Sequence, residues 1–66
     1  MRRRRYWEVQ EAFYDDGSVV ANIMRSLLAE KKPEGHFSEL RKCDVYVDYF
    51  PSLAAAEREV REARLA

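Results

Sequence analysis

The sequence predicts an α+β two-layer sandwich, in which one C-terminal helix covers a three-stranded antiparallel sheet in the order β-β-β-α. Three observations support this. Polar and apolar residues alternate over residues 5–14, 18–25 and 43–50, which is typical of half-buried strands. An Asp-Gly pair separates the first two segments and is a strong hairpin signal. After Ser52, apolar residues recur every three or four positions, as in an amphipathic helix.

The turn between the first two segments decides which side chains share a face. A three-residue turn over residues 15–17 pairs Phe13 with Val19 and Val9 with Ile23, which gathers the apolar side chains of both strands on one face. A two-residue turn moves the apolar set of the second strand onto the polar face of the first. We therefore predict the three-residue turn, with the glycine that ends it in the left-handed conformation.

Residues 27–42 are predicted to form a long irregular connection, because they contain a cluster of charges with a proline and a glycine. The third strand, residues 43–50, ends at Pro51, which has no N–H to donate to a sheet. Its alternation places Val45 and Val47 on the same side, and we expect that side to face the helix.

The last element is a helix from Ser52 to about residue 64. Ser52 is a favoured N-cap, and no helix breaker follows it. The apolar stripe of the helix comprises Leu53, Ala56, Val60 and Ala63. We expect it to cover a sheet face that comprises Trp7, Val9, Phe13, Val19, Ala21, Ile23, Val45 and Val47. Glu11 interrupts this apolar face.

The opposite face of the sheet is expected to stay open and to carry aromatic and apolar side chains. The residues predicted to form this interaction face are Tyr6, Tyr14, Val20, Met24, Tyr46 and Phe50. Exposed apolar patches often mark interaction sites, and a core this small gains from a partner subunit. We therefore expect a non-enzymatic protein-interaction module that forms a homodimer or binds another protein. Alternatively, residues 26–42 cover part of this face.

The run Arg2–Arg5 offers a different function. Four consecutive arginines can contact phosphates, which predicts a nucleic-acid-binding accessory protein as the alternative. The chain as a whole lacks a basic field, because 12 Lys and Arg balance 12 Asp and Glu. Residues 1–4 also fit a frayed basic tail.

Composition restricts the other classes of function. Cys43 and His36 are the only cysteine and histidine, so the sequence offers no zinc-type ligand set and no internal disulfide. A base–nucleophile dyad would need these two side chains within hydrogen-bond reach, and nothing in the sequence brings them together. We expect no catalytic residue, no cofactor and no metal.

Length and hydropathy complete the prediction. The 66 residues suffice for one domain, residues 1–66. No apolar run approaches the ~20 residues that span a bilayer, so we expect a cytoplasmic protein without membrane contact.

Overall fold

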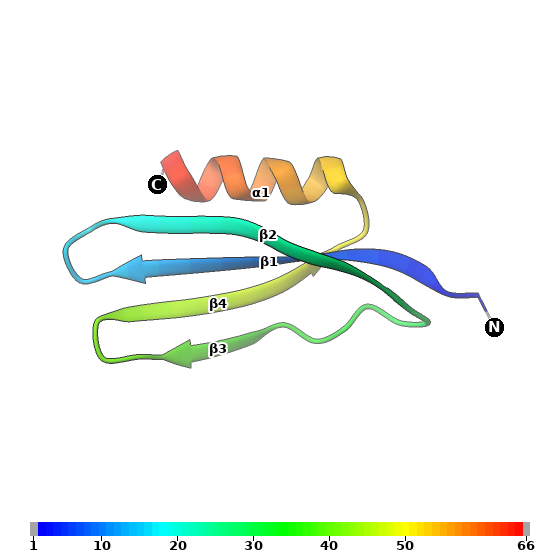
Figure 1. Ribbon diagram of the computed structural model, residues 1–66, viewed down its shortest axis with the longest axis horizontal. Helices are drawn as coiled ribbons and strands as arrows, with labels where there is room; N and C mark the ends of the chain where they lie inside the picture. The colour runs from blue at the N-terminus through cyan, green and yellow to red at the C-terminus, as the bar shows by residue number, and fades with distance from the viewer. Residues whose placement is uncertain (1, 66) are drawn as a thin grey trace.

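The computed structural model describes residues 2–65; Met1, part of the predicted tail, and Ala66 lie outside this range. The element order is β1 (Arg4–Tyr14), β2 (Val19–Ala29), β3 (His36–Glu39), β4 (Cys43–Phe50) and α1 (Leu53–Leu65). The strands form one antiparallel sheet in the order β2-β1-β4-β3. The helix α1 runs alongside β2 (Figure 1) and packs mainly on β2 and β1. The α+β class is confirmed, but the sheet has four strands rather than three.

The first hairpin has the predicted register. Phe13 lies opposite Val19, and Val9 lies opposite Ile23. Gly17 has a φ of +91°, in the left-handed region that favours glycine, and its N–H donates a 3.0 Å hydrogen bond to the Tyr14 carbonyl. The turn is therefore set by local residues, as the sequence indicated.

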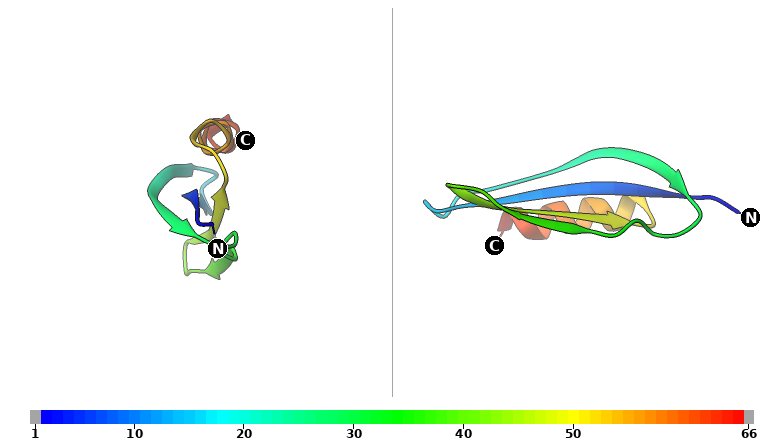
Figure 2. Two further views of the ribbon diagram at one scale, coloured as in Figure 1. Left: turned by 90° about the vertical axis from the view of Figure 1, so that its right-hand side faces the viewer. Right: turned by 90° about the horizontal axis from the view of Figure 1, so that it is seen from below.

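The strand β2 is longer than predicted and contains a bulge. Val9 pairs with Ile23 while Glu8 pairs with Arg25, so Met24 is the extra residue on β2. A bulge bends its strand and increases the local twist. Beyond this point β2 turns away from the side of the sheet on which α1 lies (Figure 2).

The predicted irregular connection contains the short strand β3. His36 lies opposite Val47 and Ser38 opposite Val45, so β3 extends the sheet beyond β4. The chain enters β3 at Gly35, where a methyl group would lie 2.6 Å from the Val47 carbonyl oxygen. A glycine is required at this close approach. All four residues of β3 are exposed, and therefore no buried alternation marks it in the sequence.

The predicted sidedness of β4 was wrong. Trp7 lies opposite Phe50 and Val9 opposite Asp48, which places Phe50, Asp48 and Tyr46 on the face that carries α1. Val45 and Val47 point to the other face. The two faces of this strand carry similar apolar content, so the pairing with β1 decides its orientation.

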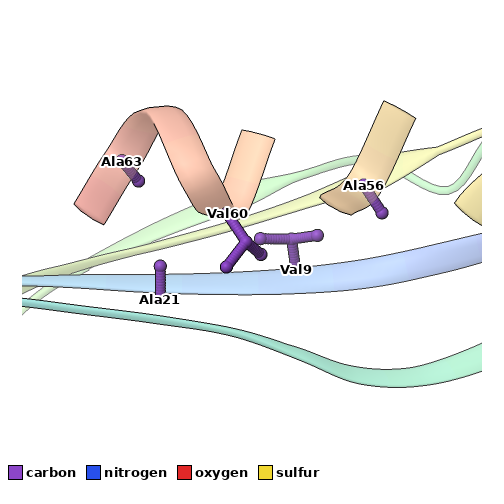
Figure 3. Close-up of a cluster of buried hydrophobic side chains, with 5 residues drawn as sticks. All are labelled: Val9, Ala21, Ala56, Val60 and Ala63. Carbon is purple, nitrogen blue, oxygen red and sulfur yellow. The ribbon is translucent and has the colours of Figure 1, made fainter. Parts of the chain in front are cut away.

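The core lies between α1 and the β2–β1 half of the sheet. Its buried cluster comprises Val9, Ala21, Ala56, Val60 and Ala63 (Figure 3), with Trp7, Val19, Ile23 and Phe50 packed against it. The predicted cap is confirmed, since the Ser52 hydroxyl accepts a 3.1 Å hydrogen bond from the Ala55 N–H. Near the other end of α1, Arg64 donates hydrogen bonds of 2.9 and 3.2 Å to the Ala21 carbonyl. These contacts fix the helix over one half of the face.

The helix α1, the only one within residues 2–65, is not long and apolar enough to cross a membrane.

Candidate functional site

The face that carries α1 is only half covered. The helix packs mainly on β2 and β1 and touches β4 least, so the β4–β3 side of the same face remains open. A groove of about 450 Å³ lies there. We call it the acidic–aromatic groove and define it by Val9, Glu11, Phe37, Tyr46, Asp48 and Glu59, all of which line it.

Aromatic rings from three strands meet at this groove. The Tyr46 ring lies 5.6 Å from the Phe13 ring in an edge-to-face arrangement and 4.8 Å from the tilted Phe37 ring. Tyr46 remains 46% exposed and Phe37 51% exposed. The rings support one another and still present surface to a ligand.

Three carboxylates lie beside these rings. Glu11 comes from β1, Asp48 from β4 and Glu59 from α1. Partial burial raises the pKa of Glu11 to about 7, helped by a hydrogen bond with Glu59 and by repulsion from the Glu59 and Asp48 carboxylates. The Lys32 ammonium lies 3.7 Å from Asp48, and both side chains are more than half exposed. The groove is therefore acidic, although Glu11 is partly protonated near pH 7 and Lys32 offsets part of the Asp48 charge.

Rings beside carboxylates suit one class of ligand. A cation above an aromatic face is attracted by the ring quadrupole, and the guanidinium group can also donate paired hydrogen bonds to a carboxylate. The groove combines both features within one surface. Such a surface has the chemistry to hold a positively charged, planar side chain.

The opposite face, which we call the open face, holds a second polar cluster. The Tyr49 hydroxyl donates a 2.7 Å hydrogen bond to Glu8 Oε2, and Arg25 Nε donates one of 3.3 Å to the same oxygen. The hydrogen bond to Glu8, together with burial, raises the pKa of Tyr49, while the Glu8 charge raises the pKa of Arg25. Tyr49 is 6% exposed and its hydroxyl is satisfied within the fold, whereas the Arg25 side chain stays exposed.

The six residues predicted as one interaction face do not form one surface. Tyr6 is buried, and Phe50 packs half-buried against the core under α1. Tyr46 lies in the acidic–aromatic groove on the helix-bearing face. Met24 is the exposed bulge residue. The remaining two, Tyr14 and Val20, lie on the open face and are 40% and 48% exposed.

The arginines of the run Arg2–Arg5 are all exposed. Arg2 and Arg3 precede β1, whereas Arg4 and Arg5 belong to it. The Arg5 guanidinium donates a 2.8 Å hydrogen bond to the Ser26 hydroxyl. The other expected property of this run, contact with phosphates, stays a prediction.

The structure does not bring His36 and Cys43 together. His36 lies opposite Val47, four residues along β4 from Cys43, and four residues of strand span about 13 Å. A proton cannot pass directly between groups at that separation. Within residues 2–65, no group of three or more His, Cys, Asp or Glu side chains is arranged to hold a metal ion.

No protein-family model matches the chain, and neither a curated protein nor a solved structure matches it. The candidate site is therefore inferred only from the geometry of this chain. Sequence reasoning missed the groove, although Glu11 already stood out as a charge on an apolar strand face. Recognising the site requires β3, which contributes Phe37, and the correct sidedness of β4.

Proposed function

We propose that the protein is a non-enzymatic protein-interaction module whose binding surface is the acidic–aromatic groove. The observation that carries this proposal is the pair of half-exposed rings, Phe37 and Tyr46, beside the carboxylates of Glu11, Asp48 and Glu59. A small protein that leaves two adjacent rings half exposed at its surface loses apolar burial that would otherwise stabilise it. A partner that covers these rings recovers that burial.

The chemistry of the groove selects the partner. Glu11 and Glu59 are close enough for mutual repulsion to raise a carboxyl pKa. A bound cation relieves that repulsion, whereas an anion increases it. The expected ligand is therefore a protein segment that presents an arginine or a lysine, with arginine preferred because its planar guanidinium both stacks and donates in pairs.

Titration of the isotopically labelled full chain with short capped peptides tests this function. An arginine-containing peptide is expected to shift amide signals of β3, β4 and the Glu59 turn of α1, and a glutamate-containing peptide of the same length is expected to shift none. Glu59→Gln removes one partly exposed charge and should weaken binding about threefold. Equal shifts with both peptides, or none with either, would refute the proposal.

The open face is a second surface on which two copies can pair. Tyr14 and Val20 are exposed there, and the partly buried Val45 lies in the same cross-strand row as Val20. Face-to-face packing of two such sheets would give the homodimer that the sequence predicts. Sedimentation equilibrium of Val20→Glu tests this contact, since a charge in an apolar interface should weaken any association that uses this face. A dimer of unchanged affinity would exclude the open face.

Nucleic acid binding remains the alternative, and the four exposed arginines of the run Arg2–Arg5 favour it. Each phosphate contact adds a salt-dependent term to the affinity. The carboxylates of the groove oppose it, because they repel phosphate. Titration with generic duplex DNA at low salt decides the matter: no binding at low ionic strength removes this function.

A further inference from the structure

The chain carries both halves of a complementary pair of surfaces. Its 12 acidic and 12 basic residues cancel, but they are not evenly mixed. Four of the basic residues form the run Arg2–Arg5, and all four are exposed. Acidic residues from β1, β4 and α1 meet in the acidic–aromatic groove. Opposite charges are thus segregated onto two separate places in one molecule.

The arginine run of a given copy does not reach its own groove. Arg4 is paired with Ala29 in the sheet, which holds the backbone of β1 extended from that residue. Asp48 lies opposite Val9, five residues farther along β1, or about 17 Å from Arg4. Arg2 precedes Arg4 by two residues, about 7 Å, and its side chain of six bonds adds about 7 Å more. In the structure the segment before β1 instead runs beyond the end of the sheet, away from the groove (Figure 1).

The two arginines within β1 are also held away from the groove. Arg5 is four residues from Val9, about 13 Å along the strand, and its guanidinium is engaged by the Ser26 hydroxyl at 2.8 Å. The groove therefore lies open to a basic segment from another molecule, and the arginine run is exposed to the surroundings. Within one chain, the arginine run does not bind the acidic–aromatic groove.

We propose that the acidic–aromatic groove of one copy binds the arginine run of a second copy. This inference rests on the proposed function, because it names the partner of the same groove. The guanidinium of Arg2 or Arg3 stacks on the exposed rings of Phe37 and Tyr46 and donates hydrogen bonds to Glu59. Two copies that exchange their runs satisfy both grooves at once through a two-fold contact.

A charge-reversal pair in the full chain tests the exchange. Arg2→Glu with Arg3→Glu alters the run before the first strand, and Glu59→Arg alters the groove. Each variant alone should dimerise at least about tenfold more weakly than the unaltered chain. A mixture of the two should recover association, because the mixed dimer has one unaltered contact and one contact in which both charges are reversed. Glu57→Arg is the matched control. Glu57 lies on the flank of α1 that faces β2, so this substitution makes the same charge change outside the groove.

Sedimentation equilibrium at 50 and 500 mM salt gives the readout, with tighter association expected at the lower salt because the contact is exposed. A monomer at high micromolar concentration, or a dimer unaffected by either reversal, would overturn the exchange. The peptide titration separates the two failures: if an arginine peptide still binds the groove of such a monomer, the proposed function stands and only the identity of the partner is wrong.

Discussion

The two halves of the helix-bearing face differ in their side chains and in how far α1 covers them. The β2–β1 half has small side chains such as Ala21, over which the alanines of α1 approach closely, and it is buried. The β4–β3 half has the large rings of Tyr46 and Phe37 together with Asp48, and no element covers it within residues 2–65. Apolar side chains allow the helix to pack on the first half, whereas the carboxylates of the second half do not. Stability is therefore concentrated in one half and surface chemistry in the other.

The largest effect should come from a charge placed in the covered half. Ala21 is 1% exposed beneath α1, and Ala21→Glu would force a larger, charged side chain into the apolar core, costing more than about 3 kcal/mol of unfolding free energy. Asn22→Glu places the same group on the adjacent exposed residue and should cost about 1 kcal/mol or less. Urea denaturation measures both. Similar losses for the two variants would mean that the helix does not cover Ala21.

A smaller effect is expected at the entrance to the open half. Gly35→Ala places a methyl group 2.6 Å from a backbone oxygen of Val47, which should cost about 2 kcal/mol and displace β3. The displacement should carry Phe37 away from Tyr46, so amide protection in β3 should fall while that in β1 and β2 persists. Uniform loss of protection across all four strands would show that the two halves fold as one unit.

Removing a groove ring should separate binding from stability. Tyr46 is 46% exposed, so Tyr46→Ala should cost about 1–2 kcal/mol of unfolding free energy, less than a fully buried ring. Binding of the arginine peptide should nevertheless fall about tenfold, because the stacking surface is lost. Comparison with Val20→Ala on the open face controls for general destabilisation. Unchanged peptide affinity in Tyr46→Ala would contradict a role for the ring.

The smallest effect is a dependence of stability on pH. Glu11 has a pKa of about 7 in the folded chain against 4.5 ordinarily, so the folded state holds the proton more tightly than the unfolded state. Its contribution is present below about pH 4.5 and is lost as the pH rises to about 7, and solvent screening limits the loss to about 1 kcal/mol. Glu11→Gln should remove this slope, because the amide that replaces the carboxyl group does not titrate. Denaturation midpoints of both proteins between pH 5 and 8 test it.

Local signals predicted the first hairpin and the helix. Gly17 ends the turn in a left-handed conformation, and the pairing of Val9 with Ile23 gives the register of the hairpin. Ser52 caps the start of the helix. These features depend on residues close together in the sequence, where propensity and pattern are informative.

The missed features depend on pairing between distant segments. The strand β3 is short and fully exposed, so it leaves no periodic trace. The two faces of β4 carry similar apolar content, and its orientation follows from the pairing of Phe50 with Trp7 across the sheet. The groove forms only when β3 joins the sheet and β4 turns Tyr46 and Asp48 toward the helix-bearing face. The residue pattern of a single strand reveals neither.

The bulge at Met24 has a consequence for how this protein meets others. The outer strands of a sheet are natural templates for strand addition, which leads to fibrils when it propagates. Here Met24 interrupts the regular spacing of β2 halfway along its length, and the opposite border, β3, offers only four residues. Neither border presents a long, flat ladder to a neighbouring chain. Contacts between molecules are thereby directed to side chains rather than to the backbone, which protects a concentrated solution from ordered aggregation.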